Sequence, residues 1–220
     1  MPRAALDLDK FGGVVRAASL LDERQKRRGE QAARWGREEL AGRLVELSAG
    51  RAGSALTVAM GLVWQAQMQA EPVAWVHAAE SSDASSFYPP DVARGGIDLG
   101  ALAVVRVADG HKAARAADKL ARSGGFGLVV LDLGGAAPPP TPLMRRLLKW
   151  AEEHDTALLC LTDRPEDAPA ICPLVSLRAV AGRRRVDEDR FECRVEVVRD
   201  KQRGPGWSHE EVCCGPPGLR

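Results

Sequence analysis

The sequence lacks the features of several large classes of protein. Aromatic residues are few, with one Tyr, four Phe and five Trp, so a platform of aromatic side chains that stacks on single-stranded nucleic acid is not expected. The five Cys include no C-x-x-C pair, and the four His are scattered, so no zinc-binding spacing can be assembled. We therefore expect reduced cysteines, no bound metal and no cofactor.

Long hydrophobic runs and an excess of one charge are also missing. No apolar run reaches the length of about 20 residues that crosses a membrane, and the start of the chain lacks the apolar stretch of a signal peptide. Lys and Arg number 31 against 30 Asp and Glu, for a net charge of +1. Strong bulk attraction to nucleic acid or to a membrane surface is therefore not implied. We expect a cytoplasmic protein that does not contact a membrane.

Apolar strands and amphipathic helices alternate along most of the chain. Strands are predicted near residues 44–48, 73–76, 101–105, 127–132 and 156–161, and helices near 55–69, 113–121 and 142–154. The run 127–132 is almost entirely apolar, which is typical of a parallel strand buried on both faces. Segments 174–180 and 191–198 then predict an antiparallel pair at one edge. The sequence thus predicts an α/β fold with a mainly parallel central sheet flanked by helices.

Changes in composition and apolar pattern along the sequence divide the chain into three parts. Residues 1–42 are predicted to form an N-terminal helical arm, with a densely charged helix over 14–40. Residues 43–207 form the predicted α/β core, and residues 208–220 are expected to be a loosely ordered tail. The arm is interpreted either as a solvated helix or as a docking element for another protein.

The segment between the first predicted strand and the next helix has the context of a P-loop, G-x-x-x-x-G-K-[ST], which binds nucleotide phosphates. The four defining positions are occupied by Ala49, Ser54, Ala55 and Leu56. Ala55 cannot supply the charge of the lysine, and Leu56 cannot supply the hydroxyl that holds Mg²⁺, so ordinary ATP hydrolysis is not expected. Residual anion binding through backbone N–H groups and one guanidinium stays an alternative. It would involve Gly50, Arg51 and Gly53.

Asp132 ends the apolar strand predicted at 127–132. In a P-loop ATPase, an aspartate at this place helps to hold the metal ion. Here the metal would lack its second partner, the P-loop hydroxyl. The alternative interpretation is that Asp132 caps the turn after the strand.

The order of these segments resembles the recombinase RecA over roughly residues 43–207. The similar stretches are residues 45–48, 75–80, 95–102, 120–132 and 197–205. The resemblance implies a RecA-like core. The two stretches that bind single-stranded DNA in RecA correspond here to 134–142 and 163–172, which are short, proline-rich and not basic. Asp163 stands where the family has a glutamine that senses the γ-phosphate, so strand exchange by this chain alone is not expected.

A shortened RecA-like core with a degenerate P-loop resembles the ImuA family, accessory proteins of bacterial error-prone polymerases. The most similar passage contains residues 75–76, 87–93 and 96–99. The resemblance implies a non-catalytic, RecA-like pseudo-ATPase of the SOS response, which acts in DNA repair by translesion synthesis. Its implied partners are RecA, whose filaments it would modulate, and an inactive Y-family polymerase-like protein. The division inhibitor SulA resembles the same fold, so inhibition of cell division is an alternative function.

One basic cluster, near the end of the core, is a candidate partner-binding surface. It consists of Arg199, Lys201 and Arg203. In RecA the corresponding segment reaches the nucleotide of a neighbouring protomer, so the resemblance implies that these residues contact a partner.

A second basic cluster is a candidate for weak DNA binding. It consists of Arg183, Arg184 and Arg185, with Arg178, Arg190 and Arg194 nearby. Three consecutive arginines cannot all face one way on a strand, so we expect them in a turn. The alternative for this cluster is that the turn is a solvated hairpin tip. A separate alternative, for the whole chain, is that it is a working ATPase with an unusual phosphate-binding loop.

Overall fold

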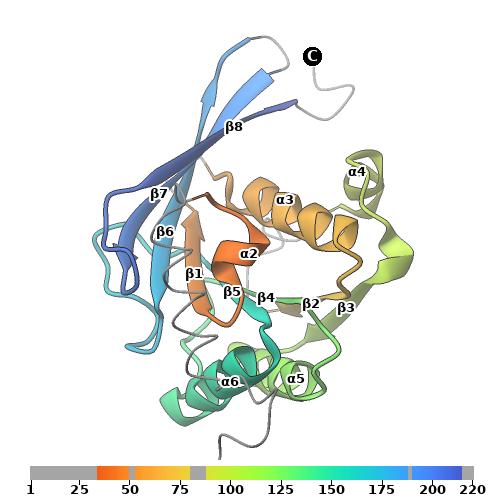
Figure 1. Ribbon diagram of the computed structural model, residues 1–220, viewed down its shortest axis with the longest axis vertical. Helices are drawn as coiled ribbons and strands as arrows, with labels where there is room; N and C mark the ends of the chain where they lie inside the picture. The colour runs from red at the N-terminus through yellow and green to blue at the C-terminus, as the bar shows by residue number, and fades with distance from the viewer. Residues whose placement is uncertain (1–33, 50–52, 80–87, 188–189, 215–220) are drawn as a thin grey trace, which may run out of the picture. The chain divides into compact units, whose positions relative to one another are not determined.

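Eight strands in the described part of the chain form one sheet, in the order β3-β2-β4-β5-β1-β6-β7-β8 (Figure 1). The structure is a computed structural model that describes residues 34–49, 53–79, 88–187 and 190–214. The strands are β1 (Leu44–Ala49), β2 (Val73–Ala78), β3 (Leu102–Val107), β4 (Leu128–Gly134), β5 (Ala157–Thr162), β6 (Leu177–Arg185), β7 (Arg190–Asp200) and β8 (Ser208–Cys214). The helices are α2 (Arg37–Leu40), α3 (Ala55–Met68), α4 (Pro89–Arg94), the 3₁₀ helix η3 (Leu99–Ala101), α5 (Gly110–Arg122) and α6 (Thr141–His154).

The pairing confirms a mainly parallel sheet with antiparallel strands at one edge. Every neighbouring pair from β3 through β6 is parallel. Strand β7 is antiparallel to β6, and β8 is antiparallel to β7. This arrangement is consistent with a RecA-like α/β fold.

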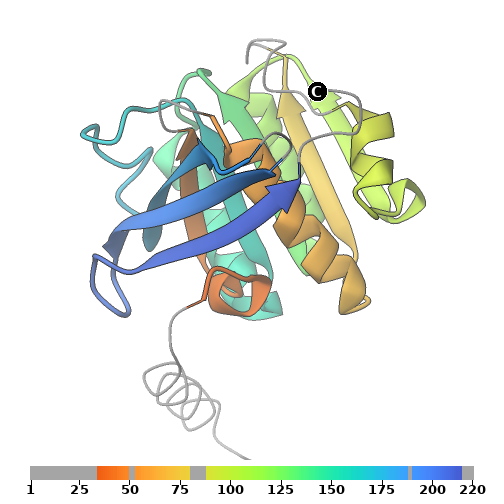
Figure 2. The ribbon, with the colours of Figure 1, turned by 90° about the horizontal axis from the view of Figure 1, so that it is seen from above.

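The sheet separates two apolar layers. Helix α3 covers one face, and α5 and α6 lie side by side on the other (Figure 2). Side chains alternate between the layers along a strand: Leu128 and Val130 of β4 pack with α3, whereas Val129 and Leu131 pack with α5 and α6. In the ranges that the structure describes, no helix is long and apolar enough to cross a membrane.

The structure corrects the predicted end of the N-terminal helix. Residues 1–33 of the predicted arm lie outside the described residues. Residues 34–36 are not helical, because Gly36 is extended with φ −167°, and only the short helix α2 follows it. A continuous helix to residue 40 is therefore wrong.

The structure also corrects the prediction of a loosely ordered tail. Residues 208–214 form strand β8, which pairs with β7 from Glu196↔Ser208 to Arg190↔Cys214. Strand β8 lacks the alternation of apolar and polar residues that would have predicted it. It is held in part by charge, because Glu210 forms an ion pair at 3.4 Å with Arg194 of the neighbouring strand β7. Residues 215–220 lie outside the described residues.

Candidate functional site

Several of the predicted site residues lie at the carboxyl ends of the parallel strands, where ligands bind in open α/β sheets. Ala49 ends β1, and Ser54 is the N-cap residue of α3. Gly53 has φ +48°, a left-handed conformation that suits glycine. Ser54 has φ −112° and needs no such freedom. Gly50 and Arg51 lie outside the described residues.

The first turn of α3 shows what replaces the phosphate-binding groups of a P-loop. Ala55 is its first residue and is buried, and Leu56 is half-buried. Leu56 packs against the core cluster on this face of the sheet. The hydroxyl of Ser54 is buried and finds no hydrogen-bond partner among the described residues. The described part of this junction therefore presents apolar side chains where a nucleotide site needs a cation and a metal-binding hydroxyl.

Asp132 lies near the carboxyl end of β4, two residues before the strand ends at Gly134, but its carboxylate faces other protein groups. Its Oδ2 atom lies 2.9 Å from Nδ1 of His77 and accepts a hydrogen bond from the indole N–H of Trp75 at 3.4 Å. All three residues are buried. His77 and Asp132 are register partners on the neighbouring parallel strands β2 and β4. The carboxylate therefore belongs to a buried hydrogen-bond cluster, and the expectation of a turn cap is wrong.

The electrostatics at this strand end are unfavourable to a second negative group. Burial raises the pKa of Asp132, and the hydrogen bond and charge of His77 oppose this rise without cancelling it. The carboxylate of Asp163, which begins the segment after β5, raises the pKa of Asp132 further. Two carboxylates thus lie near the place where the resemblance would put the γ-phosphate of a nucleotide.

The segment after β5, residues 163–172, is held to the core by buried charges that the sequence analysis missed. Glu46, in the middle of β1, is fully buried. Its carboxylate accepts hydrogen bonds from the Thr162 hydroxyl at 3.1 Å and from the Ile171 amide at 2.8 Å. A single acidic residue within an apolar strand was the only signal in the sequence.

Arg178 holds the same segment from β6. Its guanidinium donates to the carbonyl oxygens of Pro165 at 2.7 Å, Glu166 at 2.9 Å and Ala168. Its Nε atom lies 3.7 Å from Glu46, and only 5% of the side chain is exposed. Arg178 therefore does not belong to an exposed basic cluster. The segment that the resemblance would align with a DNA-binding loop is fixed here at both ends.

The cluster of Arg199, Lys201 and Arg203 is not a uniform cationic surface. Arg199 and Lys201 are exposed, and Nζ of Lys201 donates to the Pro173 carbonyl at 2.7 Å. Arg203 instead forms a two-pronged ion pair with Glu39 of α2, at 3.1 and 2.9 Å, and its side chain is 15% exposed. Of the three residues, only Arg199 and Lys201 are exposed.

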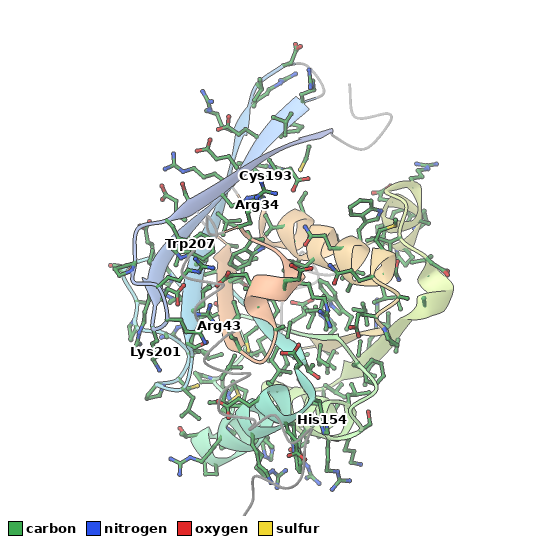
Figure 3. The ribbon with its side chains drawn as sticks, in the orientation of Figure 1. Arg34, Arg43, His154, Cys193, Lys201 and Trp207 are labelled. Atoms are coloured by element: carbon green, nitrogen blue, oxygen red, sulfur yellow. The ribbon has the colours of Figure 1, made fainter. Side chains whose placement is uncertain are left out.

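The Arg203–Glu39 pair extends into a buried network, and Figure 3 labels two of its residues, Arg43 and Trp207. Arg43 contacts Glu39 at 3.3 Å and Asp200 at 2.6 Å, and the indole N–H of Trp207 donates to Asp200 at 3.1 Å. Burial alone would raise the pKa of Asp200, but hydrogen bonds from the Gln202 amide and from Arg43 outweigh it and lower that pKa. The network joins α2 to the end of β7.

The triple arginine is at the end of a strand, and the predicted turn is wrong. Arg183, Arg184 and Arg185 are the last residues of β6, so they alternate between its faces. The guanidinium of Arg184 is paired with Glu192 at 3.0 Å. Arg183 lies 5.4 Å over the ring of Phe191. The cluster is exposed, but neighbouring groups on β7 partly neutralise and orient it.

No protein-family model matches this chain, and no curated protein matches it either. Within the described ranges, no group of three or more His, Cys, Asp or Glu side chains is arranged to hold a metal ion. The described site is a strand edge with apolar groups, a hydrogen-bonded carboxylate and a fixed neighbouring segment.

Proposed function

We propose that this chain is a non-catalytic RecA-like interaction protein of damage-induced mutagenesis. It acts by binding RecA, its polymerase-like partner, or both, as the resemblance to the ImuA family implies. A chain of this architecture presents one protomer surface to a RecA filament. It cannot extend the filament through a nucleotide joint of its own.

The observation that carries this proposal is the replacement of nucleotide chemistry by internal contacts. Ala55 and Leu56 occupy the first turn of α3 where a P-loop needs a lysine and a hydroxyl. Oδ2 of Asp132 is already engaged by His77 and Trp75. The described part of this junction therefore lacks the lysine and the hydroxyl with which a P-loop binds phosphate and Mg²⁺, while the sheet and its helices are kept.

The contacts around residues 163–172 support the same proposal. A segment that binds single-stranded DNA must leave its backbone and side chains accessible to the strand. Here Glu46 and Arg178 bind the segment from within the core. This arrangement favours a role in contacts between proteins over strand exchange.

The test is a titration of RecA with this protein, followed by DNA-dependent ATPase activity and strand exchange. Binding is measured separately by co-elution of the two proteins. A change in RecA activity at a substoichiometric ratio is expected, because a protein that cannot extend a filament acts at its ends. Absence of both co-elution and any change in activity would refute binding to RecA.

A charge-reversal variant tests the partner surface. The double variant Arg199→Glu/Lys201→Glu is expected to weaken RecA co-elution, because both side chains are exposed. The matched control is Arg94→Glu/Arg190→Glu, which makes the same charge change at exposed positions elsewhere. Arg203 is left unchanged, because its reversal would break the ion pair with Glu39. Equal co-elution of both variants would remove Arg199 and Lys201 from the interface.

A further inference from the structure

Helices α5 and α6 carry a concentration of exposed basic side chains. Every exposed residue of α5 is basic in type: His111, Lys112, Arg115, Lys119 and Arg122. The neighbouring α6 exposes Arg145, Arg146 and Lys149. We refer to these eight residues as the α5–α6 basic face.

Most of the lysines and arginines of this face have no carboxylate partner among the described residues. Lys112 is paired with Asp109 at 3.1 Å, and Arg146 is paired with Asp118 at 2.6 Å. Within the part of the chain that the structure describes, no ion pair is formed by Arg115, Lys119, Arg122, Arg145 or Lys149. Lys149 lies 4.6 Å over the ring of Trp150. The chain as a whole has a net charge of only +1, so this face is a local excess of positive charge.

Acidic side chains bound this face at one end. Glu152 and Glu153 are exposed in the last turn of α6. His154, at the end of the same helix and labelled in Figure 3, stacks on Trp150. The cationic area therefore covers α5 and the first two-thirds of α6.

The spacing of the cations places them in two adjacent rows. Lys112, Arg115, Lys119 and Arg122 follow one another at intervals of three and four, so they lie on one face of α5. This row is about 15 Å long at the rise of an α-helix. Asp118 of α5 contacts both Arg146 and Trp150 of α6, so the two helices are packed together and the second row of cations lies beside the first.

The absence of apolar anchors decides which polyanion fits this face. Protein interfaces are centred on buried aromatic and aliphatic side chains. The exposed large hydrophobic residues of the described ranges include Trp64, Met68, Tyr88 and Val104, and none of the set lies on α5 or α6. Binding to a phosphate backbone needs cations at repeated spacing and no such anchor.

We propose that the α5–α6 basic face binds the phosphate backbone of nucleic acid without preference for base sequence. Duplex DNA carries one charge per about 1.7 Å of its axis, so each row of cations spans several phosphates. The face has no exposed Phe, Tyr or Trp side chain on which bases could stack, so single strands gain little additional contact. This inference does not rest on the proposed binding to RecA.

The test measures binding of the full chain to a short fluorescent DNA duplex by anisotropy. A micromolar dissociation constant is expected at about 50 mM salt, and five unpaired cations predict a weakening on the order of several hundred-fold at about 200 mM. The triple variant Arg115→Glu/Lys119→Glu/Arg122→Glu should bind at least about tenfold more weakly. The matched control Arg183→Glu/Arg184→Glu/Arg185→Glu makes the same charge change on the β6 hairpin and should bind within about threefold of the natural sequence.

Several outcomes would overturn the proposal. They are no binding at low salt, unchanged binding by the α5 variant, and loss of binding only in the hairpin variant. Tighter binding of a polyglutamate peptide than of the duplex would assign the face to an acidic protein instead. The milder variant Arg115→Gln/Lys119→Gln/Arg122→Gln should show a smaller loss, and it keeps the test decisive if circular dichroism shows that the glutamate variant does not fold.

Discussion

Replacing Arg178 with methionine should destabilise the protein strongly, because the side chain satisfies buried groups from two directions. Its guanidinium donates to the carbonyl oxygens of Pro165, Glu166 and Ala168, and it lies 3.7 Å from the carboxylate of Glu46. Methionine has a similar length but no donor and no charge. The substitution therefore leaves the fully buried Glu46 without its nearest cation.

The magnitude follows from the cost of an uncompensated buried charge. Removing one partner of a buried ion pair typically costs about 3–5 kcal/mol. For a chain of this size, about 1 kcal/mol shifts the melting temperature by about 2–4 °C. The expected decrease in melting temperature is therefore about 6–20 °C. Arg164, whose Nε lies 3.9 Å from Glu46, favours the lower part of this range.

Thermal unfolding by circular dichroism, with urea unfolding as a second measurement, tests this expectation. The matched control is Arg184→Met, because Arg184 pairs with Glu192 on the surface and its side chain is 75% exposed. That substitution should cost no more than about 1 kcal/mol. Equal effects of the two substitutions would refute the reasoning, because burial is the difference between them.

The partner residue provides a second readout. Glu46→Ala should destabilise by a similar amount, and the double variant Glu46→Ala/Arg178→Met should lose less than the sum of the single losses, because it leaves no unpaired charge. All three variants should be cleaved faster within residues 163–172 during limited proteolysis. Strict additivity of the two losses would show that the side chains are not coupled.

Three further predictions concern the strand edge and the buried network. Asp132→Asn should raise the melting temperature at neutral pH, because burial raises the pKa of Asp132 and disfavours its ionised form in the folded state; melts at decreasing pH should show this gain shrinking toward pH 4. Asp200→Asn should destabilise the protein by about 3 kcal/mol at pH 7, because it removes the charge that faces Arg43. Urea unfolding should show this difference beginning to shrink as the pH falls below 3.8, the ordinary value, because the folded-state pKa of Asp200 lies below it. Millimolar ATP with Mg²⁺ should leave the melting temperature unchanged, whereas a ligand at a hundred times its dissociation constant would stabilise by about 2.7 kcal/mol.

The elements that the sequence predicted best are those whose residues are buried on both faces. Strands β4 and β5 are almost continuously apolar, and in an α/β chain such short apolar runs are typical of parallel strands buried on both faces. Strand β8 was not predictable in this way. Its outward residues are held by cross-strand charges such as Arg194–Glu210, which depend on a pairing that the sequence does not encode locally.

Prediction of the candidate site from the sequence would have required the order of the strands in the sheet. His77 and Asp132 are each visible at the end of an apolar strand, but their hydrogen bond exists only because β2 is the neighbour of β4. Arg178 has the same appearance in the sequence as the exposed arginines that follow it. Arg178 is distinguished by its hydrogen bonds to carbonyl oxygens of residues 163–172. This segment is irregular, so no helical or strand periodicity in the sequence predicts its path.

The position of β1 in the sheet determines when the protein can fold during its synthesis. This strand leaves the ribosome early, but its two neighbours are β5 and β6, where Leu44 pairs with Leu158 and Val45 pairs with Leu177. The largely apolar β1 therefore has no neighbouring strand to pair with until most of the chain has been synthesised. Such late pairing of distant segments slows folding and exposes unpaired strand edges to aggregation. Any truncation that removes β6 should therefore leave the nascent chain dependent on chaperones.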